Sequence, residues 1–504
     1  MKTKRIFYNL VVGVLGQVIA IILGLLLPRY FIGTFGSEIN GIVNTVTQIY
    51  IYINLLEAGV GTATIQALYK PISSDNKQEI NSILSATSNY YKKTGILYLL
   101  AVFVFAFSFP FLFKTTVDNF TIFCIVLFSG LGGVINFFFQ GKYRLLLEAE
   151  GKSYIISSLT TSISIISTVI KIILIIKGFN VIAVQFSFFV INLLQVFVIG
   201  RIIQKSYKWI DLKVSPNYNA ISQKNSVLIH QVSFMVFSNT DVLLLSMFIG
   251  FKIVSVYSLY ALIFRTVSTL LSIANNSAAF ALGQVFHKDI ERFKKLIDTN
   301  EFVFFVLSFS AFTSVYIVII EFMKLYTRGP GFSDINYIDK NLAFMFMAIE
   351  VLKSVKPVMN SVVNVSGHFK QTTNRAILEM IINLVVSLIC VNIFGVYGVL
   401  IGTVCALLYR SNDFVLYVNK KILNRSPLKS YARWIFNIIL CVLIVYLTRN
   451  IHISSSSYIE FLKGGIIIFT LVTSVFVILN SILFKSDLKV IIDYIKLRTR
   501  KNLS

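Results

Sequence analysis

Apolar residues occur along the chain in long runs that short polar segments separate. A membrane-spanning helix needs roughly 20 apolar residues to cross about 30 Å of hydrocarbon. Fourteen runs are long enough, and the pattern predicts a helix in each of them. The predicted spans are 7 to 27, 39 to 69, 90 to 113, 119 to 141, 154 to 176, 180 to 204, 225 to 249, 253 to 282, 297 to 323, 341 to 365, 374 to 393, 396 to 419, 432 to 449 and 462 to 484. The sequence therefore predicts an all-α polytopic membrane protein.

The two halves of the chain resemble each other at an offset of about 217 residues. The Phe-Ile-Gly sequence at residues 31–33 recurs at residues 248–250, and the turn at residues 177–180 has a counterpart near residues 394–395. Many transporters are built from internal repeats that enclose a binding site near the membrane midplane. We therefore predict two pseudo-symmetric six-helix lobes, followed by two further C-terminal helices.

The loops predict where the lobes begin and end. The longest predicted cytoplasmic connection contains Trp209, Pro216 and several lysines, and we interpret it as the linker between lobes. After the last span, Leu488 and Ile492 share a helical face while basic residues lie elsewhere, which suits an interfacial helix or a solvated basic tail. The predicted parts are the N-terminal lobe with helices 1 to 6 (1–210), the linker (211–224), the C-terminal lobe with helices 7 to 12 (225–425), helices 13 and 14 (426–485) and a basic amphipathic cytoplasmic tail (486–504).

Composition and loop charge support this layout. With 56% hydrophobic and 13% charged residues, the chain is not an ordinary water-soluble globule. When the N-terminus is assigned to the cytoplasm, 32 basic residues fall in cytoplasmic segments and nine in outer ones, as the positive-inside rule requires. We therefore predict a multi-pass protein of the plasma membrane with both termini in the cytoplasm. The formal net charge of +24 then reflects orientation and contact with anionic lipid, and it does not indicate nucleic-acid binding.

Polar side chains form strips along one face of several predicted spans. Spacings of three and four residues place the members of each strip on the same helical face. Such a strip either lines a cavity or forms hydrogen bonds between packed helices. The predicted lining of a substrate cavity is Gln48, Asn54, Asn136, Ser164, Thr168, Lys171, Ser272, Asn276 and Asn383.

Three basic residues lie at similar predicted depth near the membrane midplane: Arg265, Lys353 and Lys356. An ionised side chain there costs roughly 2.5 to 3.5 kcal/mol, so such residues usually serve a function. Glu350 is one turn from Lys353 and is predicted to neutralise part of this charge. Arginine offers a two-pronged donor and lysine a point charge, which suits phosphate or pyrophosphate. We predict that these three residues bind a substrate headgroup.

Carboxylates within the spans are candidates for coupling transport to an ion. Asp241, Glu57 and Glu350 could each bind a proton or Na⁺ in one state, and each could equally be a structural counter-ion. The four cysteines and four histidines are scattered without paired spacing, so no metal site or disulfide framework is predicted. The chain has no phosphate-binding loop of the GK[ST] kind, and nothing predicts ATP hydrolysis or a cofactor.

Short motifs add a resemblance to a known family. The sequences LLEAGVG at residues 55–61, ALYKP at residues 67–71 and NTDVLL at residues 239–244, which leads to Tyr257 and Ser258, resemble polysaccharide-transport flippases of the Wzx type. Those proteins belong to the multidrug/oligosaccharidyl-lipid/polysaccharide (MOP) exporter superfamily. The resemblance extends over almost the whole chain and includes the number of helices and the two lobes.

The resemblance implies a flippase that translocates an undecaprenyl-pyrophosphate-linked oligosaccharide from the inner to the outer leaflet, by alternating access between the lobes. The implied role is capsule or cell-surface polysaccharide synthesis, with a polysaccharide polymerase and other assembly proteins as partners. A multidrug exporter or a lipid II flippase of the same superfamily remains an alternative. A membrane polysaccharide polymerase or ligase is a weaker one, because the longest predicted outer loop, Lys324 to Lys340, is short and lacks histidine.

The overlay of the halves predicts that the lobes differ in chemistry. At the 217-residue offset, Gln48 is opposite Arg265, and Asn136 is opposite Lys353. The charged residue belongs to the second half in both pairs. We therefore predict that the C-terminal lobe holds most of the pyrophosphate, while the N-terminal lobe offers neutral hydrogen-bonding groups to the sugar.

Overall fold

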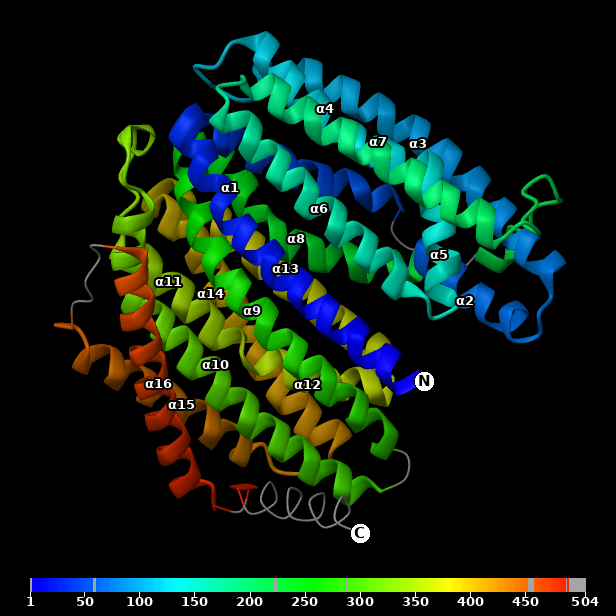
Figure 1. The fold of residues 1–504 in the computed structure, drawn as a ribbon. Helices are drawn as coiled ribbons and strands as arrows, with labels where there is room; N and C mark the ends of the chain where they lie inside the picture. Colours follow the sequence, from blue (N-terminus) through cyan, green and yellow to red (C-terminus); the bar gives the residue numbers. More distant parts are fainter. Residues whose placement is uncertain are drawn as a thin grey trace. The chain divides into compact units, whose positions relative to one another are not determined.

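The computed structural model describes residues 2–57, 60–221, 224–286, 289–451, 457–485 and 487–488 (Figure 1). Every regular element in this part of the chain is a helix, which confirms the predicted all-α class. The predicted basic tail at 486–504 lies outside the described residues, apart from Asp487 and Leu488.

Contacts divide the chain into two compact units. Unit 1 comprises Met1–Ser255 and Gly329–Ile335, and unit 2 comprises Val256–Arg328 and Asn336–Ser504. Unit 1 contains α1 (Lys2–Ile53), η1 (Asn54–Glu57), α2 (Val60–Ser73), α3 (Lys77–Leu112), α4 (Asn119–Ile135), η2 (Asn136–Gln140), α5 (Gly141–Ala149), α6 (Ser153–Ile176), α7 (Val181–Ser206), η3 (Asn219–Ile221), α8 (Lys224–Phe248) and η4 (Pro330–Phe332). Unit 2 contains α10 (Ile290–Tyr326), α11 (Lys340–Lys353), α12 (Val355–Ser366), α13 (Phe369–Phe394), α14 (Val396–Tyr417), η5 (Val418–Ile422), α15 (Leu428–Leu447) and α16 (Tyr458–Leu483). Helix α9 (Phe251–Phe286) begins in unit 1 and continues in unit 2.

Among the described residues, eleven helices are long and apolar enough to cross a membrane. Three observations account for the difference between this number and the fourteen predicted spans. The first predicted span and the first part of the second are two helices that meet at a kink at Gly36, where φ is +82°, and they are counted together as α1. Of α8, only Met235–Phe248 lies wholly among residues whose side chains are described, and this stretch is shorter than a membrane span. The tenth predicted span is divided at Ser354 into α11 and α12.

The second predicted span, 39 to 69, is also interrupted. Helix α1 ends at Ile53, and a 3₁₀ turn, η1, follows over Asn54–Glu57 before α2 begins at Val60. Apolar composition continues across this break, so a count of hydrophobic residues does not reveal it. Asn54 and Glu57 therefore lie in the 3₁₀ turn and not in an α-helix.

Polar loop residues start several of the long helices. The side chain of Asp118 accepts a hydrogen bond from the Thr121 N–H at 2.8 Å, and Asp339 accepts one from Leu342 at 2.9 Å. The first N–H groups of a helix have no partner within the helix, and such a capping residue satisfies one of them. Asn76, Asn180, Asp289 and Ser457 cap α3, α7, α10 and α16 in the same way.

The core of unit 1 lies where α1, α3 and α4 meet. Tyr50 and Tyr98 are buried there, and the Tyr50 hydroxyl donates to the Val126 carbonyl at 2.8 Å. The two tyrosines lie directly against Gly130 and Gly133, where an added Cβ would come within 2.4 Å of the Tyr50 ring and 2.3 Å of the Tyr98 hydroxyl. Glycine thus lets aromatic side chains pack onto the backbone of α4.

Helices α13 and α14 of unit 2 also pack through glycine. An added Cβ at Gly402 would lie 2.0 Å from the Ser387 Oγ and 2.8 Å from the Asn383 carbonyl oxygen. At Gly398 it would lie 2.1 Å from the Cys390 carbonyl oxygen. Backbone atoms cannot rotate aside as a side chain can, so these two positions require glycine.

We expect Gly402→Leu to destabilise the protein by at least about 1 to 3 kcal/mol, the usual cost of overpacking. The matched control is Gly465→Leu in α16, where an added Cβ meets nothing within 4 Å. The melting temperatures of the two purified variants should differ clearly, with Gly402→Leu the lower. Equal melting temperatures would show that α13 and α14 do not pack as described.

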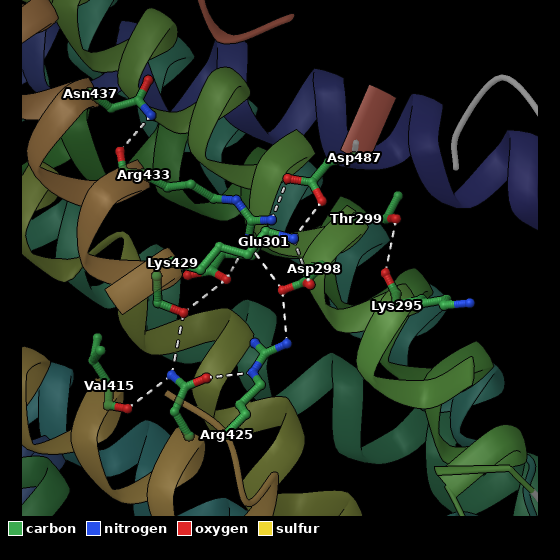
Figure 2. A network of polar contacts seen from close by, with 12 residues as sticks. Lys295, Asp298, Thr299, Glu301, Val415, Arg425, Lys429, Arg433, Asn437 and Asp487 are labelled. Carbon is green, nitrogen blue, oxygen red and sulfur yellow. Dashed lines mark hydrogen bonds and ion pairs between the residues drawn. The ribbon is translucent and has the colours of Figure 1, made fainter. Parts of the chain in front are cut away.

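A cluster of buried charges connects α10, the start of α15 and the residues after α16 (Figure 2). This Arg433 cluster consists of Asp298, Glu301, Arg425, Lys429, Arg433 and Asp487. The Arg433 guanidinium is 1% exposed, donates to Glu301 at 2.8 Å and to Asp298 at 3.2 Å, and pairs with Asp487. The three basic and three acidic groups balance in charge. Buried charges are tolerated when they are paired in this way, so the cluster holds α15 and the end of α16 on α10.

Candidate functional site

The break between α11 and α12 places two of the predicted headgroup residues. Ser354 lies between the helices, with Lys353 ending α11 and Lys356 in the first turn of α12. Pro357 has no backbone N–H, so it cannot supply the helical hydrogen bond to the Lys353 carbonyl four residues earlier. Interrupted helices of this kind form substrate sites in many transporters.

Lys353 pairs with Glu350, as the one-turn spacing predicts. The Lys353 ammonium lies 2.6 Å from the Glu350 Oε1, and the Ser268 hydroxyl on α9 donates to the other carboxylate oxygen. The Glu350 side chain is 6% exposed, whereas that of Lys353 is 36% exposed. The pair therefore joins α9 to α11 and leaves the positive member accessible.

Lys356 pairs with a carboxylate on another helix. Its ammonium donates to Glu379 on α13, and the Arg410 Nε on α14 lies 3.4 Å from the second oxygen of the same carboxylate. Glu379 and Arg410 are both buried. One carboxylate thus links α12, α13 and α14.

Arg410 extends the chain of charges to Asp413. The Arg410 Nη1 donates to Asp413 at 2.7 Å, and Arg375 on α13 donates to the other oxygen of Asp413. The Arg410 guanidinium lies 3.9 Å from the ring centroid of Phe414, and that of Arg375 lies 4.6 Å from the ring centroid of Tyr417. The aromatic rings thus help to orient both arginines.

We call this set the α11–α14 cluster; its members are Glu350, Lys353, Lys356, Arg375, Glu379, Arg410 and Asp413. Four basic and three acidic groups leave one positive charge in excess. Arg265 is exposed on α9, one turn before Ser268. The carboxylates are 6 to 9% exposed, whereas Lys353 and Arg375 are 36% and 38% exposed. The accessible charge of the cluster is therefore positive and suits a phosphate or pyrophosphate group.

The predicted cavity residues of unit 1 lie on separate elements. Asn54 begins η1 and Asn136 begins the π-helical turn η2. Gln48 is half-buried on α1, and its side-chain oxygen accepts no hydrogen bond within the described structure. An unsatisfied buried oxygen is available to a ligand hydroxyl or a water molecule.

The α6 residues of the prediction have local partners. The Thr168 hydroxyl donates to the Ser164 carbonyl at 2.8 Å. The Lys171 ammonium lies 4.2 Å from the ring centroid of Phe188 on α7. This cation–π contact accounts for Lys171 without a ligand.

The remaining predicted lining residues belong to unit 2. Ser272 is exposed and donates to the Ser268 carbonyl at 2.8 Å. Asn383 is fully buried, and its amide donates to Thr403 at 3.0 Å between α13 and α14, so it packs these helices together. The side chain of Asn276 lies outside the described residues.

The candidate ion-coupling carboxylates are all at least partly buried. Asp241 on α8 is 8% exposed. Glu57 accepts a hydrogen bond from the Tyr91 hydroxyl at 2.7 Å, and Glu350 is held by Lys353 and Ser268. Ion coupling stays a prediction for each of them. Among the residues that the structure describes, no three His, Cys, Asp or Glu side chains are grouped as a metal site would require.

The sequence did not predict that Arg410, Arg375 and Asp413 belong to this site. Arg410 and Asp413 are three residues apart, a spacing that predicts a pair on one helical face. The link from Arg410 to Glu379 joins two helices and depends on how they pack, so residue spacing does not reveal it.

Known structures share this fold. No protein-family model matches the chain, and no curated protein sequence matches it significantly. The inward closed conformation of the lipid II flippase MurJ matches 94% of this chain and 99% of its own, with a TM-score of 0.72 and 15% identity.

Multidrug transporters of the MATE family match as well. An inward-facing MATE transporter of the MOP superfamily matches 86% of this chain and 98% of its own, with a TM-score of 0.64 and 12% identity. The Vibrio cholerae MATE transporter VcmN, in a mutant form, matches 84% of this chain and 98% of its own, with a TM-score of 0.54 and 16% identity. The chain therefore has the fold that MurJ and the MATE transporters share.

Proposed function

We propose that the chain is a flippase that carries an undecaprenyl-pyrophosphate-linked oligosaccharide from the inner to the outer leaflet of the plasma membrane. Three lines support this proposal: the sequence resemblance to polysaccharide flippases, the fold shared with MurJ and MATE transporters, and the α11–α14 cluster. The cluster carries the most weight, because its accessible side is basic while its carboxylates are buried.

The charge of the cluster fits the proposed substrate. A pyrophosphate diester is a dianion, and the accessible side chains of the cluster, Lys353 and Arg375, are both basic. In our proposal Lys353 and Lys356 bind the two phosphates as point charges, while Arg265 supplies a two-pronged donor. The exposed hydroxyl of Ser272 on α9 is a candidate to bind the sugar.

The proposal includes alternating access between two lobes, with both termini in the cytoplasm. It rests on the internal repeat and on the 32 to 9 division of basic residues between predicted cytoplasmic and outer segments. A polysaccharide polymerase that consumes the translocated lipid-linked glycan is the expected partner. A lipid II flippase would bind the same pyrophosphate group with another glycan. A multidrug exporter has less use for basic side chains near the membrane midplane.

We expect Arg265→Ala to reduce surface glycan export by about 10- to 100-fold, because a hydrogen bond to a charged group contributes about 1.5 to 3 kcal/mol. Export is measured as surface glycan in cells that carry the variant as their only copy. The control is Lys324→Ala, which removes a lysine that pairs with Glu321 at 2.7 Å and lies outside the cluster. Normal export by Arg265→Ala at normal protein levels would remove Arg265 from the headgroup site.

A further inference from the structure

A second group of basic residues lies in unit 1, at the end that the loop charges assign to the cytoplasm. Helix α4 is followed by the π-helical turn η2, Asn136–Gln140, and then directly by the short helix α5. Single π-helical turns within helices are rare and occur frequently at functional sites. Lys142 is the second residue of α5 and is 9% exposed.

Two glycines bring this region against α3. An added Cβ at Gly141 would lie 2.1 Å from the Tyr91 ring, and one at Gly95 would lie 3.0 Å from the Phe138 ring. Tyr91 is itself held in place, because its hydroxyl donates to Glu57 at 2.7 Å. The next residue of α3 is Lys92, which is exposed. Glycine and tyrosine therefore set the backbone positions from which Lys142 and Lys92 extend.

Lys142 and Lys92 carry like charges that no described carboxylate neutralises. Among the described residues, neither ammonium has a hydrogen bond or an ion pair, and Lys142 contacts the Tyr143 ring, 5.1 Å from its centroid. Burial, and then the positive charge of Lys92, lowers the pKa of Lys142. Glu57, a carboxylate of the neighbouring turn η1, is engaged by Tyr91. A buried, unpaired ammonium costs several kcal/mol, and a bound anion would offset that cost.

We propose that Lys142 and Lys92 form a phosphate-binding site in unit 1, for the phosphate ester of a lipid headgroup or for a soluble pyrophosphate. The site lies just beyond the candidate membrane span Asn119–Phe139, so we expect it at the depth of membrane headgroups. Phe139, at the end of that span, is 56% exposed and faces away from the protein core, as an acyl-chain contact would. The inference does not rest on the proposed function, because any phosphate-bearing molecule at this depth satisfies it.

Lysine labelling tests the site without a transport assay. The full chain is placed in nanodiscs of phosphatidylcholine, with or without phosphatidylglycerol, and separately in phosphatidylcholine with inorganic pyrophosphate. An amine-reactive acetylating reagent then modifies exposed lysines, and mass spectrometry gives the extent at each position. We expect bound phosphate to reduce labelling of Lys92 by about tenfold, while the neighbouring exposed Lys93 changes little. Protection by phosphatidylglycerol alone identifies a lipid headgroup, and protection by pyrophosphate alone identifies a soluble ligand.

Substitutions of Lys142 test whether its side chain is needed for phosphate to protect Lys92. Lys142→Met should abolish the protection of Lys92, Lys142→Arg should retain it, and the control Lys93→Met should not change it. In phosphatidylcholine alone, Lys142→Met should be at least as stable as the unmodified protein, because it removes an unpaired buried charge. Unchanged labelling of Lys92 in both ligand conditions would overturn the proposal. A lower melting temperature of Lys142→Met in phosphatidylcholine would also overturn it, since it would indicate a structural role for the lysine.

Discussion

Arg433→Met is expected to destabilise the protein by about 3 to 5 kcal/mol, the usual cost of breaking a buried ion pair by removing one partner. Arg433 is 1% exposed, and Glu301 beside it is 0% exposed. Among the described residues, removal of the guanidinium leaves the Glu301 carboxylate with only the Ser430 hydroxyl as a hydrogen-bond donor, 3.1 Å away. Thermal unfolding of the purified variant measures the loss, and export should fall with the amount of folded protein.

Two further variants test whether the loss of stability comes from the unpaired buried charge or from substitution within the cluster in general. Lys429→Met removes a side chain of the same cluster that is 41% exposed, so it should cost no more than about 1 kcal/mol. Arg433→Met combined with Glu301→Gln should be more stable than Arg433→Met alone, because the unpaired carboxylate is gone. If Lys429→Met and Arg433→Met are equally stable, the Arg433 cluster does not hold α15 and α16 in the way described.

Replacement of both Lys353 and Lys356 by Met should reduce export by more than about 100-fold. Each lysine contributes about 1.5 to 3 kcal/mol through a hydrogen bond to a charged group, and every 1.4 kcal/mol corresponds to about tenfold in rate. The same replacements leave Glu350 and Glu379 without their lysine partners. Loss of export alone would therefore not distinguish a binding role from unfolding.

A charge-balanced variant makes that distinction. Glu350→Gln and Glu379→Gln, added to the two methionine substitutions, remove the unpaired carboxylates and should restore stability. Export should remain as low as before, because the phosphate-binding charges are still absent. Lys356→Arg keeps the positive charge and should retain most of the export. Recovery of export in the charge-balanced variant would assign both lysines a structural role only.

The sequence predicted the helical class and most of the spans because a run of 20 or so apolar residues rarely occurs outside a membrane-spanning helix. It did not predict the interruptions at Asn54–Glu57 and at Ser354, since apolar residues flank both of them closely. Pro357 was a visible signal for the second interruption, but a proline within a span is also compatible with a simple kink.

Contacts in the candidate site were predictable from the sequence only where both residues lie on the same helix. Glu350 and Lys353 pair as their spacing predicts, because both lie on α11. Glu379 meets Lys356 and Arg410 only after three helices pack, and sequence spacing contains no information on that packing. For the same reason Asn383, predicted as a cavity residue, lies fully buried between α13 and α14.

The predicted difference in binding chemistry between the two halves stays a prediction. In unit 2, Lys353 and Arg375 of the α11–α14 cluster are accessible basic side chains, and Arg265 is exposed on α9. Unit 1, however, contains Lys142 and Lys92 in addition to its neutral polar groups. We therefore expect two phosphate sites of different depth, one beyond the end of a span and one at an interrupted helix.

Translocation by the purified protein in proteoliposomes tests the proposed function and the role of the two lysines together. The assay compares a polyprenyl-pyrophosphate-linked oligosaccharide with the same glycan on a polyprenyl monophosphate, in the unmodified protein and in the charge-balanced Lys353 and Lys356 variant. We predict that the unmodified protein moves the pyrophosphate-linked lipid in preference, and that the folded variant moves neither lipid above the rate of empty vesicles. If the variant moves the pyrophosphate-linked lipid as fast as the unmodified protein does, Lys353 and Lys356 do not bind the pyrophosphate.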